Sequence, residues 1–192
     1  MRAFFERLPR SLLWAFCFGV SCLPAAGQTP KLVSTWPGYL RREMQRADVS
    51  GRYAYVASYY AGLEILDLSD IAHPVRVGGY NPNGNLPLQG STAENVVVSG
   101  NYAYVVFRLV PGRSGLHVVD VSDPTAPVVR GKTFTSRHCN DVAVAGHYAY
   151  VAAEADGLFI ADVTDPSAPV QRGFYNTSGE AMGVAVADNL AY

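Results

Sequence analysis

The chain has 192 residues, of which 49% are hydrophobic, and its charge is nearly balanced, with 15 Lys and Arg against 16 Asp and Glu. This length accommodates one or two domains with a substantial core. No segment concentrates basic residues, so the electrostatic footprint of a nucleic-acid-binding protein is missing, and we expect no nucleic acid partner.

The first 27 residues have the composition of a secretory signal peptide. Three arginines in "MRAFFERLPR" precede the apolar run "SLLWAFCFGVSCL", and "PAAG" supplies small residues for cleavage. The alternatives are an N-terminal anchor or a buried helix, and a lipid anchor at Cys22 is disfavoured by Gly19. Because the apolar run is short for a bilayer span, we expect a mature chain without a membrane span that is secreted, periplasmic or on the cell surface. Residues 28–40 form a lead-in segment.

The rest of the chain is built from repeats. The motif "YAY" ends at Tyr55, Tyr104 and Tyr150, and a fourth copy begins near the C-terminus with "VADNLAY". A period of about 40 to 50 residues is typical of propeller blades or of paired-helix solenoids.

Strand chemistry favours the propeller. The third copy divides into four short runs, "DVAVAG", "HYAYVAA", "GLFIADV" and "PVQRGFY", which are rich in Val, Tyr, Phe and Ile and bounded by Gly, Asp and Pro. Four strands per unit make one blade of an all-β propeller with antiparallel blades. We therefore predict blades near residues 41–80, 91–134 and 137–175 and a truncated blade from residue 178, within a repeat region of residues 41–192. Both faces of the runs are apolar, so each blade should pack between two others.

A recurring turn joins the last two strands of each unit. The stretches "DLSDIAHP", "DVSDPTAP" and "DVTDPSAP" combine Asp and Ser or Thr, which cap turn amides, with proline, which fixes one φ angle. A calcium site at the paired aspartates is the alternative. We predict no metal site because the turn accounts for the spacing.

These runs resemble the LVIVD-repeat family. The resemblance rests on "LEILDLSD", "LHVVDVSD" and "LFIADVTD", each preceded by Gly and following a "YAYV" strand, and it covers residues 41–192. It implies a β-propeller in an exported or surface protein, and it brings no shared catalytic residues. The first copy departs from the pattern at "SDIAHP".

The sequence stops within a strand pair after three full blades, whereas closed propellers have four to eight. The expectation is a fragment of a longer product that is aggregation-prone alone, because an unfinished blade exposes its edge. A soluble monomer with one sharp thermal transition would contradict it.

Up-and-down connectivity gathers the variable loops at one end of the blades, where binding is usually found. At this end we expect ligand contacts from Tyr59, Tyr60, Phe107 and Arg108. Positions six residues before Val49, Val98, Val144 and Val186 should meet at the mouth of the central channel. The candidates there are Glu43, Thr92, His138 and Glu180, and Asp141 is added as a neighbour of His138. Such carboxylates and a histidine could bind a cation or support acid-base chemistry, or simply make a wet channel mouth.

Other polar residues are assigned structural roles. Cys139 is the only cysteine beyond the signal segment, and we interpret it as a buried small hydrophobe rather than a reactive thiol. His73, His117 and His147 occupy positions that differ among the copies, so they are expected to be surface residues.

These patterns predict an exported repeat scaffold that acts as a non-catalytic binding or structural module, with a protein, peptide or carbohydrate at the variable end and no identifiable cofactor. Two alternatives are an enzyme of hydrolase or lyase type that uses the channel-mouth residues, and an accessory platform for a downstream catalytic or anchoring domain.

Overall fold

A computed structural model describes residues 44–82, 84, 91–109, 113–135, 138–188 and 190–192. The predicted signal peptide, the lead-in segment and Glu43 therefore lie outside the described residues. Within the described part of the chain, no helix has both the length and the apolar character needed to cross a bilayer.

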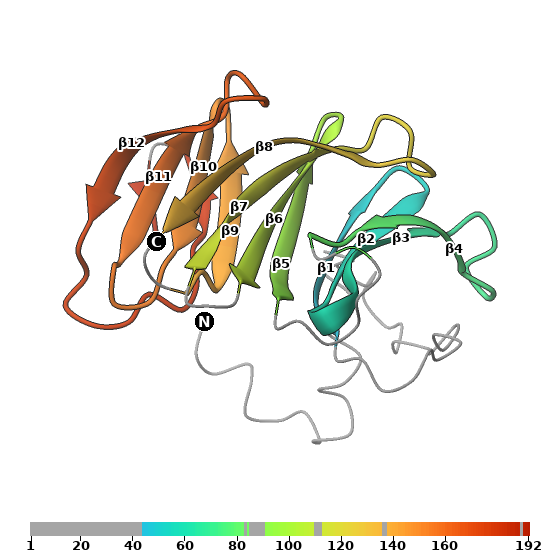
Figure 1. Ribbon diagram of the computed structural model, residues 1–192, viewed down its shortest axis with the longest axis horizontal. Helices are drawn as coiled ribbons and strands as arrows, with labels where there is room; N and C mark the ends of the chain where they lie inside the picture. The colour runs from blue at the N-terminus through green and yellow to red at the C-terminus, as the bar shows by residue number, and fades with distance from the viewer. Residues whose placement is uncertain (1–43, 83, 85–90, 110–112, 136–137, 189) are drawn as a thin grey trace, which may run out of the picture.

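Three four-stranded antiparallel sheets and one two-stranded sheet make up the fold, and they follow each other along the chain (Figure 1). Blade 1 consists of β1 (Met44–Ser50), β2 (Tyr53–Ser58), β3 (Gly62–Asp67) and β4 (Val75–Tyr80). Blade 2 consists of β5 (Thr92–Ser99), β6 (Tyr102–Leu109), β7 (Arg113–Asp120) and β8 (Val128–Thr135). Blade 3 consists of β9 (Asp141–Ala145), β10 (Tyr148–Ala152), β11 (Leu158–Asp162) and β12 (Val170–Tyr175). A partial blade follows, with β13 (Val186–Ala187) and β14 (Leu190–Ala191).

This architecture confirms the predicted all-β class and the four runs read in the third copy. In every full blade the strands are hydrogen-bonded in chain order, so each blade is a simple meander. The first turn of each blade is tight because Gly51, Gly100 and Gly146 adopt φ values of 58° to 60°, which suit glycine. One single-turn helix, η4 (Tyr59–Ala61), joins β2 to β3.

The core lies between the blades, because alternate residues of each strand face opposite neighbours. Between blades 1 and 2, Tyr55 and Ile65 pack against Val105 and Phe107. Between blades 2 and 3, Tyr104 and Val118 pack against Phe159 and other residues of blade 3. Blade 2 thus packs one of its two apolar faces against blade 1 and the other against blade 3, as expected from the sequence.

Each Asp-Pro turn is bonded within itself. In blade 2, Asp120 Oδ1 accepts hydrogen bonds from the Ser122 main-chain N–H at 2.9 Å and from the Ser122 hydroxyl at 2.7 Å. Asp123 Oδ1 accepts the corresponding pair from Thr125. The two hydrogen bonds from Ser122 are the main reason that the pKa of Asp120 falls to about 2. The aspartates therefore serve the turn, as predicted, and no group of metal-ligating side chains is found among the described residues.

The turn of one blade also contacts the outer strand of the blade before it. A Cβ built on Gly78 of β4 would lie 2.0 Å from the carbonyl oxygen of Pro124, and one on Gly131 of β8 would lie 2.4 Å from that of Pro166. Only glycine leaves room for such an approach. The outer strand of one blade is therefore in close contact with the Asp-Pro turn of the next blade at these glycines.

The inner strands are connected by carboxylates. Asp48 Oδ2 accepts a hydrogen bond from the Val98 N–H at 2.7 Å, which links β1 to β5. Asp141 Oδ2 accepts one from the Val184 N–H at 2.9 Å, which ties the segment before β13 to β9. The first strands of successive blades thus lie next to each other, as contacts between β1, β5, β9 and β13 also show.

Candidate functional site

The loop-bearing end of the blades holds a cluster of polar side chains, which we call the Arg108 cluster. Its members come from blades 2 and 3 and the segment between them: Thr92, Glu94, Arg108, His138 and Glu154. Tight turns such as those joining β5 to β6 and β11 to β12 lie at the upper side of Figure 1, and η4 marks the opposite, loop-bearing side.

Arg108 is the centre of this cluster. It lies near the end of β6, where its side chain faces blade 3. Its Nε is 3.7 Å from Glu94 Oε1, and its Nη2 is 4.0 Å from Glu154 Oε1. One guanidinium therefore stands between two half-buried carboxylates from different blades and bridges the interface electrostatically.

The predicted channel-mouth residue His138 joins the cluster through Glu154. Its Nδ1 lies 3.4 Å from Glu154 Oε1, and 40% of its side chain is exposed. Glu154 has a φ of 44°, a left-handed conformation that is uncommon for a residue other than glycine. Its main chain pairs with that of Ala181 in both directions, at 3.2 and 3.0 Å, which holds the loop in this conformation.

Thr92 belongs to the cluster but is buried. Its hydroxyl donates a 2.5 Å hydrogen bond to Glu94 Oε1 at the start of β5. The side chain therefore orients Glu94 and is not available at the surface. Among the channel-mouth candidates chosen from the sequence, Thr92 and His138 are brought into one cluster with Arg108.

The remaining channel-mouth candidates lie elsewhere. Asp141 accepts hydrogen bonds from the Asn95 side-chain amide and from the main-chain N–H groups of Val142 and Val184, so it links neighbouring blades. Glu180 is exposed, one residue before Ala181. Glu43 lies outside the described residues.

Two tyrosines stand beside the Arg108 cluster. The rings of Tyr59 and Tyr60 meet edge to face with centroids 4.5 Å apart, and 41% of Tyr60 is exposed. Both belong to η4, which packs against β5. Desolvation raises the pKa of Tyr59, and the charges of Tyr60 and Glu94 add to this, whereas Arg108 lowers it. Three of the predicted variable-end residues, Tyr59, Tyr60 and Arg108, thus lie close to two of the predicted channel-mouth residues, Thr92 and His138.

Phe107 does not belong to this surface, which corrects its prediction as a ligand contact. It is 0% exposed and packs in the core between blades 1 and 2. The reason is that β6 continues to Leu109, so Phe107 lies within the strand on the same buried face as Val105 rather than starting a loop.

His117 is likewise buried, contrary to its expected place on the surface. It packs against Phe107, with ring centroids 4.8 Å apart, and its Nδ1 lies 3.1 Å from the Tyr80 hydroxyl. Its Nε2 is buried without a hydrogen-bond partner among the described residues. Desolvation, with the nearby Lys132, lowers the pKa of His117 to about 3, so the ring is neutral at physiological pH. His73 and His147 are exposed as predicted.

Cys139 is a buried thiol, as the sequence indicated. It is 0% exposed, its Sγ lies 3.2 Å from Thr135 Oγ1, and burial raises its pKa to about 11. A thiol with this pKa is not a nucleophile at neutral pH.

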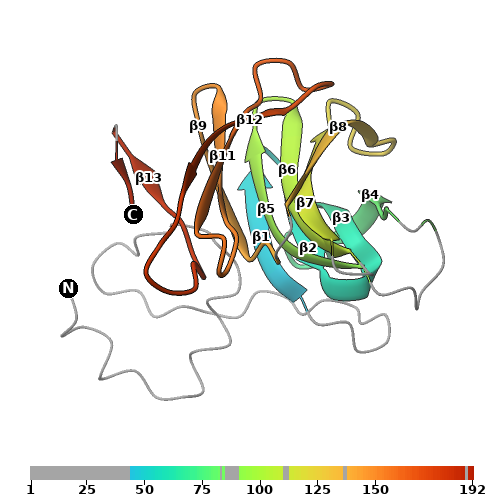
Figure 2. The same cartoon turned by 60° about the vertical axis from the view of Figure 1, so that its left-hand side comes forward.

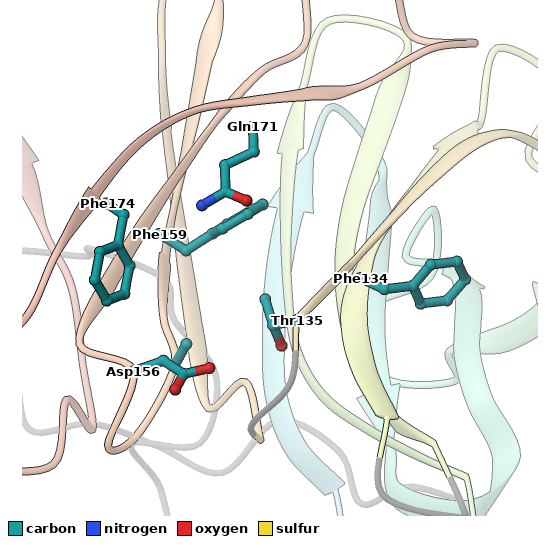
Figure 3. Close-up of a pocket in the computed structure, with 7 residues that line it drawn as sticks. Phe134, Thr135, Asp156, Phe159, Gln171 and Phe174 are labelled. Atoms are coloured by element: carbon teal, nitrogen blue, oxygen red, sulfur yellow. The ribbon is translucent and has the colours of Figure 1, made fainter.

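A groove, which the sequence did not indicate, lies between the outer strands of blades 2 and 3. The groove has a volume of about 350 Å³ and is lined by Phe134, Thr135, Ala153, Asp156, Phe159, Gln171 and Phe174. Figure 3 shows Phe159 between Gln171 and Asp156, whereas the ring of Phe134 points away from them. The groove combines aromatic rings with the polar side chains of Thr135, Asp156 and Gln171, and among the described residues Asp156 is the one charged member of its lining.

Glu94 and Glu154 are the members of the Arg108 cluster that the sequence did not reveal. Neither falls at a position that repeats among the blades, since Glu94 aligns with Gln45 and Asn140. The only signal was indirect: an arginine near the end of a strand that faces a neighbouring blade needs a carboxylate partner.

Comparison with solved structures supports the blade architecture. The chain is similar to the computationally designed Ika4 protein, with a TM-score of 0.57 and 10% sequence identity over 85% of this chain and 91% of that one. The designed Ika8 protein gives a TM-score of 0.46 with 8% identity over 83% of this chain and 57% of that one. At such low identity, the likeness to Ika4 indicates the fold alone.

The repeats themselves identify the family. No curated protein matches the chain. The model of the LVIVD repeat matches residues 42–82, 90–135 and 136–177, which correspond to the three full blades. Because these segments cover most of the sequence and coincide with the repeated strands and turns, the chain belongs to the LVIVD-repeat family.

Proposed function

We propose that this repeat scaffold is exported and acts as a non-catalytic binding module, with its ligand at the loop-bearing end. The observation that carries this proposal is the meeting of Tyr59 and Tyr60 with the Arg108 cluster. The aromatic rings of η4, the guanidinium at the end of β6 and a histidine from the segment between blades 2 and 3 lie close together there on a framework of strands.

The opposite end of the blades offers less to a ligand. Its aspartates are engaged by their own turns, as at Asp162, which accepts hydrogen bonds from the Thr164 N–H and the Arg172 Nε. Donors and acceptors that are already paired within a turn contribute little to binding. This contrast supports the loop-bearing end as the recognition surface.

The chemistry of this surface suits a peptide or a carbohydrate. The exposed ring of Tyr60 provides a flat apolar surface with a hydroxyl, which suits the face of a sugar or a peptide side chain. Arg108 and the partly exposed His138 add hydrogen-bond donors beside it. A peptide segment of a partner protein would contact the same three side chains, Tyr60, Arg108 and His138.

The test is a binding screen on peptide and glycan arrays followed by titration of the hits. Tyr60→Ala is expected to weaken binding at least about tenfold, because stacked aromatic contacts dominate such sites. Tyr148→Ala is a matched control, since Tyr148 is 42% exposed but lies beside the tight turn at the other end. If only the Tyr148 variant lost binding, the recognition surface would lie at that opposite end.

Export is the second part of the proposal. It is supported by the arginine-rich start, the apolar run and the small residues of the first 27 positions, which lie outside the described residues. The measurement is N-terminal sequencing of the protein recovered from envelope, periplasmic and culture fractions. A cytoplasmic chain that still begins at Met1 would contradict export.

One observation favours a second function, acid-base catalysis. The 3.4 Å approach of His138 Nδ1 to Glu154 Oε1 is the arrangement in which a carboxylate orients an imidazole. A hydrolase or lyase of this kind would lose turnover in His138→Gln while keeping its stability. The binding module, in contrast, would show no turnover with any ligand that it retains.

A further inference from the structure

The two interfaces of blade 2 differ in how their outer part is filled. Blade 2 lies between blades 1 and 3 (Figure 1 and Figure 2), so its two interfaces can be compared position by position. The outer part of the first interface contains the side chain of Tyr80. The outer part of the second is the groove of about 350 Å³ lined by Ala153 and Phe159 among others.

Tyr80 of blade 1 is held by two rings of blade 2. Its ring meets that of Phe107 edge to face, with centroids 5.9 Å apart. The ring of His117 is also 5.9 Å away, and the Tyr80 hydroxyl lies 3.1 Å from His117 Nδ1. A phenol ring is thus bound here by aromatic contacts and one hydrogen bond, with the hydroxyl paired as a buried tyrosine requires.

Thr133 takes the place of Tyr80 at the interface between blades 2 and 3. It pairs with Leu116 across β7 and β8, as Tyr80 pairs with Leu63 across β3 and β4. Both leucines are buried in the core on the side of the following blade. Residues that are paired directly across a sheet point to the same side, so Thr133 and Tyr80 point to equivalent places. Because threonine has no ring, blade 2 leaves open the space that blade 1 fills.

The facing residues of blade 3 enlarge this space. Phe107 and Ala153 each come three residues after the last tyrosine of a "YAY" motif, so alanine replaces one of the two rings that hold Tyr80. His117 and Phe159 each follow a Gly-Leu pair, so the second ring is kept as phenylalanine. Both Ala153 and Phe159 are part of the lining of the groove. The groove is therefore the counterpart of the space that the Tyr80 side chain fills in the preceding interface.

The remaining lining of the groove suits a phenol. Phe174 pairs with Phe159 across β11 and β12, so its ring lies on the same side of blade 3, and it is 55% exposed. Gln171 and Asp156 lie on either side of Phe159 (Figure 3), and an amide and a carboxylate are both able to bond a hydroxyl. Sites for small ligand groups have this character, a largely aromatic lining with a few polar groups that fix orientation.

We propose that the groove is a binding site for a tyrosine side chain presented by a peptide segment of a partner protein. The ring would pack on Phe159 with Phe174 at its edge, and the hydroxyl would bond to the Gln171 amide. Tyr80 fills the equivalent space as a side chain carried by a polypeptide, which favours a peptide over a free phenol as the source of the ring.

The groove adjoins the recognition surface proposed at the loop-bearing end. The loop between β10 and β11 supplies Asp156 to the groove and Glu154 to the Arg108 cluster. A peptide bound at this end therefore has the groove beside it, and in this respect the choice of a peptide rests on the proposed function. The groove itself is lined by neither Tyr60 nor Arg108, so the two sites can be tested separately.

The test is a titration of the full chain with N-acetyl-L-tyrosinamide, followed by the amide chemical shifts of the protein in NMR spectra. The wild type is compared with Thr133→Tyr, which restores in blade 2 the ring that blade 1 carries. Val128→Tyr is the matched control, because Val128 is 48% exposed and lies at the other end of the same strand, β8. We expect Thr133→Tyr to bind at least about tenfold more weakly and Val128→Tyr to bind like the wild type.

A second pair of variants gives an answer even where Thr133→Tyr does not fold. Phe174→Ala removes a ring that faces the groove, and we expect it to weaken binding about threefold or more. Phe134→Ala is its control, because Phe134 is 47% exposed on the outer strand of blade 2 but its ring points away from the other lining residues (Figure 3). Circular dichroism establishes that each variant keeps the wild-type fold.

Two further probes test the chemistry of the ligand. N-acetyl-L-leucinamide, which lacks the ring, and p-cresol, which lacks the main chain, should each bind more weakly than the tyrosinamide. Absence of tyrosinamide binding, or equal binding by the wild type and the folded Thr133→Tyr or Phe174→Ala variant, would overturn the groove as a tyrosine site. Tighter binding of p-cresol would overturn the peptide as the source of the ring. Because Tyr60→Ala should bind the tyrosinamide like the wild type, a failure of the groove and a failure of the proposed function are told apart.

Discussion

The carbonyl oxygen of Pro166 lies 2.4 Å from the point where a Cβ on Gly131 would be. This contact joins the turn of blade 3 to the outer strand of blade 2. An interface so close leaves no space for even one methyl group, because protein interiors are packed without slack.

We therefore predict that Gly131→Ala destabilises the chain by about 1–3 kcal/mol, the usual cost of overpacking. The free energy of unfolding from urea titration is the measurement. Gly179→Ala, which adds the same methyl group in open space, should leave it unchanged. Equal values for the two variants would show that the turn shifts away from Gly131 without cost.

His117 should make the stability of the chain depend on pH. In the unfolded chain a histidine takes up a proton near a pKa of about 6.5, whereas burial holds the pKa of His117 in the fold at about 3. Between these values the unfolded chain binds more protons, so the free energy of unfolding falls as the pH falls, by at most about 1.4 kcal/mol per pH unit.

The measurement compares urea unfolding of the wild type and His117→Leu from neutral pH down to pH about 3. The variant should lose this part of the slope, while the aspartates contribute equally to both proteins. His147→Leu is the control, because His147 is exposed. Parallel curves for the wild type and His117→Leu would exclude a buried neutral imidazole.

Arg108 should couple blades 2 and 3. Replacing it by methionine leaves Glu94 and Glu154 half-buried without their counter-ion, and we expect a loss of about 1 kcal/mol, limited by the partial exposure of the guanidinium. A double-mutant cycle with Glu154→Gln measures the coupling, which should shrink at high salt. Strictly additive effects would mean that the 4.0 Å approach contributes nothing to stability.

Cys139 should be inert in the folded chain. Its complete burial and a pKa of about 11 leave almost no thiolate at neutral pH. Peptide mapping after iodoacetamide treatment should find residue 139 unmodified under native conditions and modified in denaturant. Rapid native labelling would show that the segment before β9 opens frequently.

The strands could be predicted from the sequence, because alternation and turn residues repeat in each blade. Errors arose where a side chain's environment depends on the adjacent blade. His117 aligns with Glu64 and Phe159, three residues of different chemistry, and this variation was interpreted as surface exposure. In blades 2 and 3 this position faces the preceding blade, which buries His117 and Phe159, whereas Glu64 belongs to the first described blade and is partly exposed.

The candidate site was predictable only in part, for a related reason. Tyr59, Tyr60, Arg108 and His138 follow from their position in variable loops. The pairing of Arg108 with Glu94 and Glu154 depends on how far β6 extends and on the left-handed φ of Glu154. Neither of these has a repeated sequence signal, since they belong to single loops.

The repeated interface has a consequence for how proteins of this kind can change over generations. The interface between blades 1 and 2 is built like that between blades 2 and 3. In both, tyrosine and isoleucine or valine of the earlier blade pack against alanine and valine of the later blade, and a glycine of the earlier blade lies beneath a proline carbonyl of the later one. A blade copied by gene duplication would arrive with both of its contact surfaces already matched to its neighbours. Blade number is therefore a property that inheritance can alter in whole units, while the loops at one end can diverge without disturbing the contacts between blades.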